Sequence, residues 1–217
     1  DAAGISSGGD VCAFIGLGTN PRTGELWQDG SNEAVGFGGT ATRDGEDGIM
    51  HRSEPGCRNT PVEVFEMRTP LFLEQYGYRQ DSGGAGKFRG GVGISRTYRF
   101  TAPGTGIMLV YKTRTRPWGI DGGAEATPNA VILNPGTERE VWQGGSYNRL
   151  EAGELLVNAT GGGGGYGDPL DRDFGAITKD LRNGYVSPEA AARDYRVVIT
   201  DDLRIDEAAT AQLRAAG

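Results

Sequence analysis

The chain has 217 residues, 38 of them glycine, with a net charge of −7 and an isoelectric point near 4.9. This acidic balance would repel a polyanion such as nucleic acid, and the longest apolar runs are far shorter than the roughly 20 residues of a membrane span. Glycine at more than twice its usual share of about 7%, without a three-residue period, excludes collagen and indicates many tight turns between strands.

The chain begins with DAAGISSGGD, which has neither an initiating methionine nor the basic start and apolar centre of a secretory signal. We therefore expect a fragment, a processed chain or a split subunit. Cys12 and Cys57 are the only cysteines, and their separation does not match a metal site. This cysteine usage fits a reducing cytoplasm, with one structural disulfide as the alternative.

The first third of the chain gives few local signals. The apolar run 11–18 predicts a buried strand, and the acidic, glycine-rich run 34–48 predicts an ordered loop. In the stretch 60–80, Pro61 and Pro70 discourage one long helix. We expect a short strand or turn there, followed by an extended segment.

The middle of the chain reads as a series of strands. Apolar and polar residues alternate over 92–102, and a second strand is predicted over 104–114. Because a short turn with proline and glycine joins them, we expect these two strands to form a hairpin. Further strands are predicted at 129–134, 139–144 and 153–159, separated by glycine-containing turns.

Helix signals appear only in the last quarter. Ile177 and Leu181 lie one helical turn apart, ahead of a helix stop at 183–184 (Asn-Gly). Ser187 is a typical N-cap, and the proline that follows it is favoured at the first helical position. A helix over 188–195 is therefore predicted.

A strand at 196–200 and a terminal helix at 206–216 complete the predicted elements. The whole indicates an α+β protein that is rich in strands and hairpins, with glycine-rich turns and a small helical C-terminal module. We expect a strand-rich region over 1–160 and a glycine loop with the helical module over 161–217.

The glycine-rich stretch 79–91 invites a test as a phosphate-binding loop. It fails the Walker A pattern, because Phe88 follows the Gly-Lys pair where serine or threonine is needed. Its glycine spacing is one residue too long for a dinucleotide-binding turn, and a strand follows where a helix is required. We favour a turn with positive-φ positions, although Asp81, Lys87 and Arg89 could still line a cleft.

A second cluster places five consecutive glycines at 161–165, between a predicted strand and a predicted helix. Each glycine loses much backbone freedom on folding, so such a run needs a reason. Either the backbone passes close to another backbone or a ligand, or its N–H groups form an anion-binding concavity. We favour the first.

Few side chains offer catalytic chemistry of their own. His51 is the only histidine, which excludes a two-histidine metal site within the chain, and we expect it to be a surface or loop residue. No GxSxG elbow exists, and no neighbouring residue in the sequence indicates that Cys57 is activated as a nucleophile. Arg58 and Asn59 bring a cation and an amide close to Glu63, which either positions a polar substrate or stabilises a turn.

Several long motifs together resemble the hydantoinase B/oxoprolinase family. The resemblance runs from about residue 44 to the C-terminus, although members of that family are considerably longer. The motifs follow in the order that the family shows: RNTPVEVFEMRTPLFLEQYGYRQDSGGAGKFRGGVG at 58–93, RTRPWGIDGG at 114–123, LNPGTERE at 133–140, GGGGGYGDPLDRD at 161–173 and NGYVSPEAAARDY at 183–195.

The resemblance implies ATP-dependent opening of a cyclic amide such as a hydantoin, 5-oxoproline or a lactam. An A-type partner would bind ATP and phosphorylate the amide oxygen, and the B-type chain would hydrolyse the activated substrate. The family's divalent metal is expected in the missing amino-terminal half, so no metal ligand is assigned here and no cofactor is expected on this chain alone. The alternatives are a subunit of an acetone or acetophenone carboxylase, or a structural module without chemistry of its own.

Site residues are assigned within this resemblance as hypotheses. Arg58, Asn59, Glu63 and Asp81 are the catalytic candidates, and Arg89, Gly163 and Gly164 are the candidates for binding substrate or phosphate. The two glycine clusters would bring backbone N–H donors to a developing oxyanion or to the phosphoryl group. The expected partners are the amino-terminal half of the same subunit, the A-type subunit and a small cyclic amide.

Overall fold

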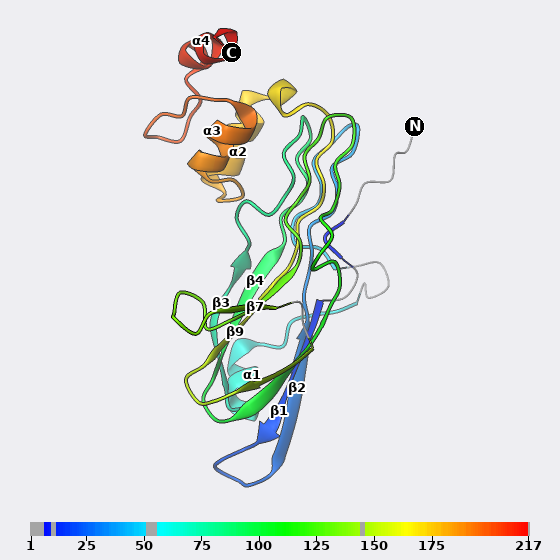
Figure 1. Ribbon diagram of the computed structural model, residues 1–217, viewed down its shortest axis with the longest axis vertical. Helices are drawn as coiled ribbons and strands as arrows, with labels where there is room; N and C mark the ends of the chain where they lie inside the picture. The colour runs from blue at the N-terminus through cyan, green and yellow to red at the C-terminus, as the bar shows by residue number, and fades with distance from the viewer. Residues whose placement is uncertain (1–6, 10–11, 51–55, 144–145, 217) are drawn as a thin grey trace.

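A computed structural model describes residues 7–9, 12–50, 56–143 and 146–216. The molecule is elongated. A β-sandwich forms one end of its long axis, a stalk of extended segments forms the middle and a helical module forms the other end (Figure 1). The described elements are β1 (Cys12–Thr19), β2 (Leu26–Asn32), α1 (Val62–Arg68), β3 (Leu71–Tyr78), β4 (Ile94–Phe100), β5 (Gly104–Val110), β6 (Ala130–Leu133), β7 (Val141–Gln143), β8 (Ser146–Leu150), β9 (Leu155–Ala159), the 3-10 turn η1 (Pro169–Asp171), α2 (Phe174–Arg182), α3 (Pro188–Tyr195) and α4 (Glu207–Ala215). The predicted class, α+β with a small helical C-terminal part, is confirmed.

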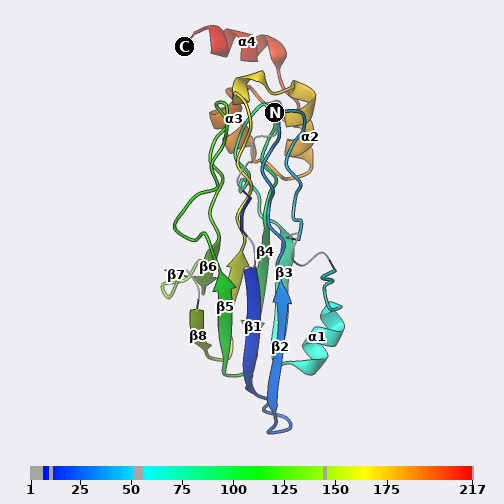
Figure 2. The same ribbon diagram turned by 90° about the vertical axis from the view of Figure 1, so that its right-hand side faces the viewer.

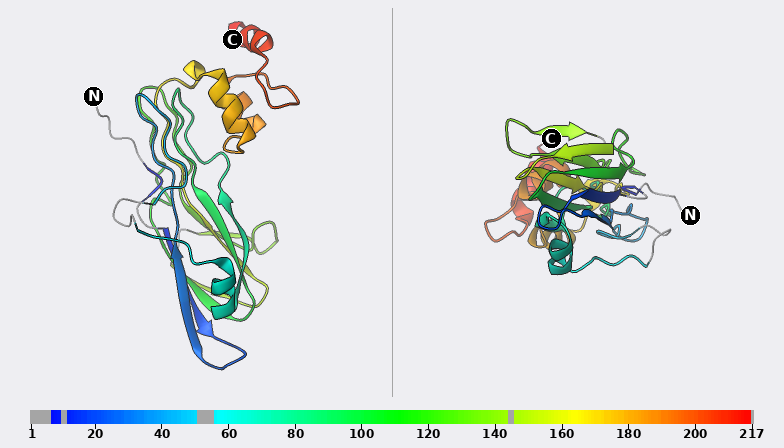
Figure 3. Two further views of the ribbon diagram at one scale, coloured as in Figure 1. Left: turned by 180° about the vertical axis from the view of Figure 1, so that it is seen from behind. Right: turned by 90° about the horizontal axis from the view of Figure 1, so that it is seen from below.

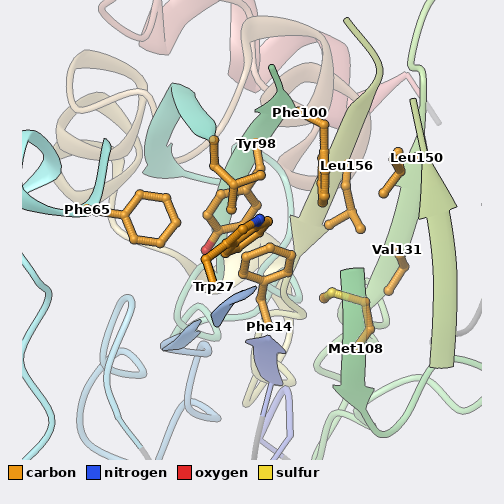
Figure 4. Close-up of a cluster of buried hydrophobic side chains, with 10 residues drawn as sticks. Phe14, Trp27, Phe65, Tyr98, Phe100, Met108, Val131, Leu150 and Leu156 are labelled. Carbon is orange, nitrogen blue, oxygen red and sulfur yellow. The ribbon is translucent and has the colours of Figure 1, made fainter. Parts of the chain in front are cut away.

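The sandwich consists of two antiparallel sheets. One has the order β2-β1-β5-β8 and the other the order β3-β4-β9-β6-β7 (Figure 2). Their inner faces meet in one apolar core, to which both sheets and α1 contribute (Figure 4). The core residues are Phe14, Trp27, Phe65, Leu71, Tyr98, Phe100, Met108, Val131, Leu150 and Leu156.

The predicted hairpin of the two central strands is wrong. β4 pairs with β3 and β9, whereas β5 pairs with β1 and β8 in the other sheet. The three-residue link between them crosses from sheet to sheet, and Phe100 and Met108 both point into the space between the sheets. Local alternation correctly predicts two strands but carries no information about which sheet each one joins.

The stretch after Pro61 is a helix, and not the short strand or turn that the two prolines suggest. Pro61 occupies the N-cap of α1, and Thr69 ends the helix with a hydroxyl that donates to the carbonyl of Phe65 at 2.9 Å. Both prolines therefore lie outside the helix, where they cost no hydrogen bond. Phe65 is buried in the core, and that burial favours the short helix. The extended segment predicted after it is confirmed as β3.

The stalk is built from glycine-rich extended segments at 36–39, 82–93, 118–127 and 160–167, which run side by side between the sandwich and the helical module (Figure 2). Their backbones bond across the stalk: Gly36 N–H to Gly161 O at 3.0 Å, and Gly163 N–H to Gly91 O at 2.8 Å. A Cβ on Gly163 would lie 2.0 Å from the backbone of Phe37.

Close backbone packing therefore accounts for the glycine run at 161–165, as the first of the two readings proposes. The glycines of 83–93 serve the same packing: a Cβ on Gly90 would lie 1.7 Å from the carbonyl oxygen of Gly163. None of these described glycines has a positive φ, and within 79–91 only Asp81 does, at φ +60°, so the predicted left-handed position falls on an aspartate and not on a glycine.

The helical module confirms most of its sequence signals. α2 ends before Gly184, which has φ +71°, and α3 spans the predicted residues with the Ser187 hydroxyl accepting the Ala190 N–H at 3.1 Å. The predicted strand at 196–200 is wrong: only an isolated bridge between Ile199 and Ile205 forms there. Figure 3 shows this module at the opposite end of the molecule from the β1–β2 turn. No described helix is both long and apolar enough to cross a membrane.

Candidate functional site

A cavity of about 470 Å³ opens at the edge of the sandwich, where β1 and β2 face α1, β3 and β4. Both sheets and the chain just before α1 contribute to its wall. The lining residues are Ala13, Phe14, Ile15, Gly30, Ser31, Asn32, Cys57, Arg58, Asn59, Thr60, Val62, Phe65, Leu73, Arg96, Tyr98 and Leu109. We call it the edge cavity.

One side of the edge cavity is aromatic. The rings of Phe14 and Tyr98 stack with their centroids 4.0 Å apart, and the ring of Phe65 lies tilted 5.9 Å from that of Tyr98 (Figure 4). Such stacked and tilted pairs are favourable arrangements of aromatic quadrupoles. This wall offers an apolar surface to a ring-shaped or aliphatic group.

The other side is polar and belongs to one hydrogen-bonded network. Arg96 and Tyr98 lie two positions apart on β4, so their side chains are on the same face of the strand. That face is directed toward Glu33, which follows β2. The carboxylate of Glu33 accepts from Arg96 Nη1 at 2.9 Å and from the Tyr98 hydroxyl at 3.0 Å, and the Ser31 hydroxyl lies 2.6 Å from that of Tyr98. Glu33 does not line the cavity, so it orients the two lining side chains from behind.

Asn59 extends the network to the mouth of the edge cavity. Its Oδ1 accepts from Arg96 Nη2 at 3.2 Å, and its Nδ2 donates to the Tyr76 hydroxyl at 3.0 Å. The Arg96 guanidinium lies 4.2 Å from the Tyr76 ring centroid, which is cation–π range. A side-chain amide has two acceptor sites and two N–H donors, so Asn59 keeps capacity for a ligand.

The network is strongly polarised. Burial and the negative charge of Glu33 raise the pKa of Tyr98 well above its usual value, so the phenol stays protonated. Burial lowers the pKa of Arg96, but Tyr98 and Glu33 outweigh it and raise the pKa overall. Glu33 Oε2 and Arg96 Nε are buried and have no partner among the described residues, so the network holds unused bonding capacity.

The four catalytic candidates do not meet at one place. Arg58 and Asn59 line the edge cavity, whereas Glu63 is exposed on the first turn of α1 and is not part of its wall. Asp81 belongs to the stalk, where it accepts from Ser187 N–H at 2.7 Å in the helical module. Asp81 has a φ of +60°, which is a left-handed conformation. The hydrogen bond from Ser187 stabilises the residue in this conformation.

Arg89 lies at the junction of the stalk and the helical module and is only 2% exposed. It pairs with Asp47 at 2.9 Å and with Asp180 at 3.3 Å, and Asp180 is shared with Arg172 at 2.7 Å. Arg172 also pairs with Asp44 at 2.7 Å. These five residues form an ion cluster that joins the stalk to α2, and its centre, Arg89, Arg172 and Asp180, is buried.

Gly163 and Gly164 lie inside the stalk. The N–H of Gly163 already donates to Gly91, and a Cβ on Gly164 would lie 1.8 Å from the carbonyl oxygen of Trp118. Packing thus explains both glycines. Their part in binding substrate or phosphate, like that of Arg89, stays a prediction.

Sequence reasoning missed the centre of the edge cavity. Arg96 and Tyr98 were predicted only as strand residues, although an arginine two positions from a tyrosine on a buried strand face could have marked a polar site. Glu33 carries no such signal, because only the fold brings it beside β4.

The described residues do not fit a metal centre. Within 7–9, 12–50, 56–143 and 146–216, no group of three or more histidine, cysteine, aspartate or glutamate side chains is arranged to hold an ion. His51 lies outside the described residues. Cys12 is buried in β1, and Cys57 is exposed at the edge cavity.

Comparisons with known proteins identify the same family that the motifs indicate. The sequence profile of the hydantoinase B/oxoprolinase family matches residues 1–169. The chain is 34% identical to the caprolactamase subunit beta of Pseudomonas jessenii over 165 residues, which are 71% of this chain and 28% of that protein.

Two solved structures share the fold. The crystal structure of the ATP-dependent caprolactamase from Pseudomonas jessenii superposes with a TM-score of 0.80 and 27% identity, covering 97% of this chain and 38% of that one. A nucleotide-free structure of acetone carboxylase gives a TM-score of 0.76 and 25% identity, covering 94% of this chain and 32% of that one. The chain thus spans well under half the length of these relatives, and its matched profile, motifs and fold show that it belongs to the hydantoinase B/oxoprolinase family.

Proposed function

We propose that this chain is the carboxy-terminal part of a B-type subunit that opens a cyclic amide in an ATP-dependent reaction. The likeness to the ATP-dependent caprolactamase over nearly the whole chain supports this proposal most directly. An A-type partner would bind ATP, and the amino-terminal half of the B-type subunit would hold a divalent metal.

The need for ATP follows from the chemistry of amides. Resonance stabilises the carbonyl, and the nitrogen is a poor leaving group, so water attacks slowly. Transfer of the γ-phosphoryl group of ATP to the amide oxygen removes that resonance. Hydrolysis of the activated carbon then breaks the C–N bond and releases phosphate.

We propose that the edge cavity receives the ring of the cyclic amide. The ring of a simple lactam presents methylene groups on one side and its N–H and C=O on the other. The aromatic wall of Phe14, Phe65 and Tyr98 suits the methylene side. On the polar side of the cavity, the side chains of Asn59 and Arg58 can hydrogen-bond to the amide group. Arg58 makes no hydrogen bond or ion pair within the described part of the chain, so its guanidinium can donate to the amide oxygen.

The decisive experiment measures ATP consumption by the natural protein with its A-type partner, in the presence of hydantoin, 5-oxoproline, caprolactam or acetone. A cyclic amide should stimulate ATP hydrolysis and be opened in equal amount. Arg58→Gln and Asn59→Ala should reduce kcat/KM by roughly tenfold or more each, as expected for lost hydrogen bonds to a bound substrate. Arg68→Gln is the matched control, because it removes the same charge as Arg58→Gln at an exposed position of α1 outside the cavity wall.

A subunit of a ketone carboxylase is the second candidate, favoured by the likeness to acetone carboxylase. Stimulation by acetone with bicarbonate, and by none of the amides, would select it. A third outcome defines a structural module: single substitutions of Arg58, Glu63, Asp81 and Arg89 would leave kcat intact and weaken only the assembly.

A further inference from the structure

A second cavity, of about 650 Å³, lies where the sandwich joins the stalk, on the side of β6 and β7. We call it the neck cavity. Three arginines line it together with hydroxyl, amide and aromatic groups, and among the described residues no acidic side chain lines it. The lining residues are Arg79, Thr113, Arg114, Arg116, Thr127, Pro128, Asn129, Ala130, Trp142 and Ser146.

We propose that the neck cavity binds a small oxyanion of the phosphate class, as a free ion or as the phosphoryl group of a small molecule. Three guanidinium groups around one concavity, in a protein with a net charge of −7, are an arrangement that a phosphoryl group satisfies through charge-assisted, paired hydrogen bonds.

Arg79 provides the fixed base of this site. Its Nη1 donates to the backbone carbonyls of Pro128 at 2.8 Å and Thr160 at 3.1 Å. Its other nitrogens make no hydrogen bond among the described residues, yet they are not sealed from solvent. The side chain is thus held rigidly by the backbone while part of its fork remains available, which limits the entropy lost when an anion binds.

Arg79 also differs from the other buried arginines in its electrostatics. Burial lowers the pKa of Arg79, and no carboxylate offsets it. Carboxylates raise the pKa of both Arg89 and Arg172 above the usual value despite burial. The positive charge of Arg79 is therefore desolvated without a counter-ion from the described chain, and an anion in the neck cavity would supply one.

Arg114 and Arg116 complete the charge. Both are exposed, and within the described ranges neither forms an ion pair or a hydrogen bond. Both lie in the bent segment that follows β5, and both reach the cavity that Arg79 lines.

The remaining wall indicates what the rest of the ligand is like. Thr113 and Ser146 offer hydroxyl groups that can donate to further oxygens, whereas the Thr127 hydroxyl already donates to Ser82 O at 3.2 Å. The indole N–H of Trp142 is used by Glu140 at 2.8 Å, so the ring offers its apolar surface. A phosphoryl group that carries a flat or apolar substituent should therefore bind more tightly than inorganic phosphate.

This inference does not depend on the proposed enzymatic function, and its test needs no turnover. Inorganic phosphate and phenyl phosphate are titrated separately into the natural protein, followed by isothermal calorimetry. We expect one site, tighter binding of phenyl phosphate, and a dissociation constant raised roughly tenfold or more by Arg114→Gln or Arg116→Gln. Arg68→Gln on α1 removes the same charge far from the neck cavity and should change affinity less than about twofold.

Arg79→Gln is not relied upon, because this residue also holds backbone carbonyls and its loss could unfold the protein. Arg79→Lys keeps the charge but loses the fork, so it should weaken binding in a protein that still melts cooperatively. Failure of both phosphates to bind would overturn the proposal. So would equal weakening by Arg68→Gln. Binding of a glutamate-rich peptide that neither phosphate displaces would also overturn it, and would identify the neck as a docking face for an acidic protein segment.

Discussion

The buried centre of the ion cluster gives the sharpest stability prediction. Asp180 is shared between Arg89 and Arg172, at 3.3 Å and 2.7 Å, and all three side chains are at most 5% exposed. Asp180→Asn keeps the shape but removes the charge that both guanidinium groups use. Breaking a buried ion pair on one side costs about 3–5 kcal/mol, because a buried charge is left uncompensated.

That loss should be visible as a shift of the melting temperature. In a protein of this size, 1 kcal/mol corresponds to roughly 2–4 °C, so the midpoint should fall by about 6–20 °C. Differential scanning calorimetry with parallel urea titration measures it. Asp201→Asn, an exposed aspartate in the same module, is the matched control and should melt like the parent.

A parent-like midpoint for Asp180→Asn would refute the reasoning, since it would mean that Asp44 and Asp47 suffice for both arginines. A second variant guards against misinterpretation. Arg172→Met with Asp180→Leu removes charges together, and it should recover part of the stability if uncompensated charge is the cause.

Three further predictions concern separate parts of the molecule. Burial raises the pKa of Asp44, but its hydrogen bond to Arg172 and the charge of that residue outweigh this and lower it below 3.8. The stability from Asp44 is therefore present above pH 3.8 and lost as pH falls through the lower native pKa, so urea midpoints of the parent and of Asp44→Asn should converge in acid. Gly163→Ala places a Cβ 2.0 Å from the backbone of Phe37, and the stalk must open to admit it, so amide exchange there should accelerate and the midpoint should fall. Burial and Glu33 raise the pKa of Tyr98, so this tyrosine should be missing from the alkaline absorbance titration until the protein unfolds.

Each of the three has a contrary outcome. If the difference in urea midpoint between the parent and Asp44→Asn stayed constant down to the lowest pH, Asp44 would not contribute to the loss of stability in acid. Unchanged exchange in Gly163→Ala would show that the stalk tolerates a side chain where the backbones touch. A smaller absorbance change in Tyr98→Phe than in the parent below the unfolding pH would show that Tyr98 ionises in the folded protein and that the edge-cavity network is open to solvent.

The sequence alone determined those elements whose signals are local. The helix 188–195 was predicted to the residue, because an N-cap serine, a first-turn proline and the following alanines act within one or two turns. Arg58 and Asn59 could be proposed as site residues for a similar reason, because a charged and an amide side chain stand directly before an apolar run; both line the edge cavity, and their role stays a prediction.

What the sequence left undecided depends on partners that are distant along the chain. The glycine run 161–165 signalled a constraint, but only the fold shows that other backbones approach within 3 Å of where each Cβ would be. β4 and β5 look alike as strands, and their separation into two sheets follows from which neighbours complete each ladder.

The edge cavity and the neck cavity were decided in the same way. Glu33 lies 63 residues from Arg96, and Arg79 lies 49 residues from Pro128, yet each pair is in hydrogen-bond contact. A chain specifies such contacts only through the packing of its sheets and stalk as a whole, because a long-range pair is stable only when the surrounding core excludes water from it.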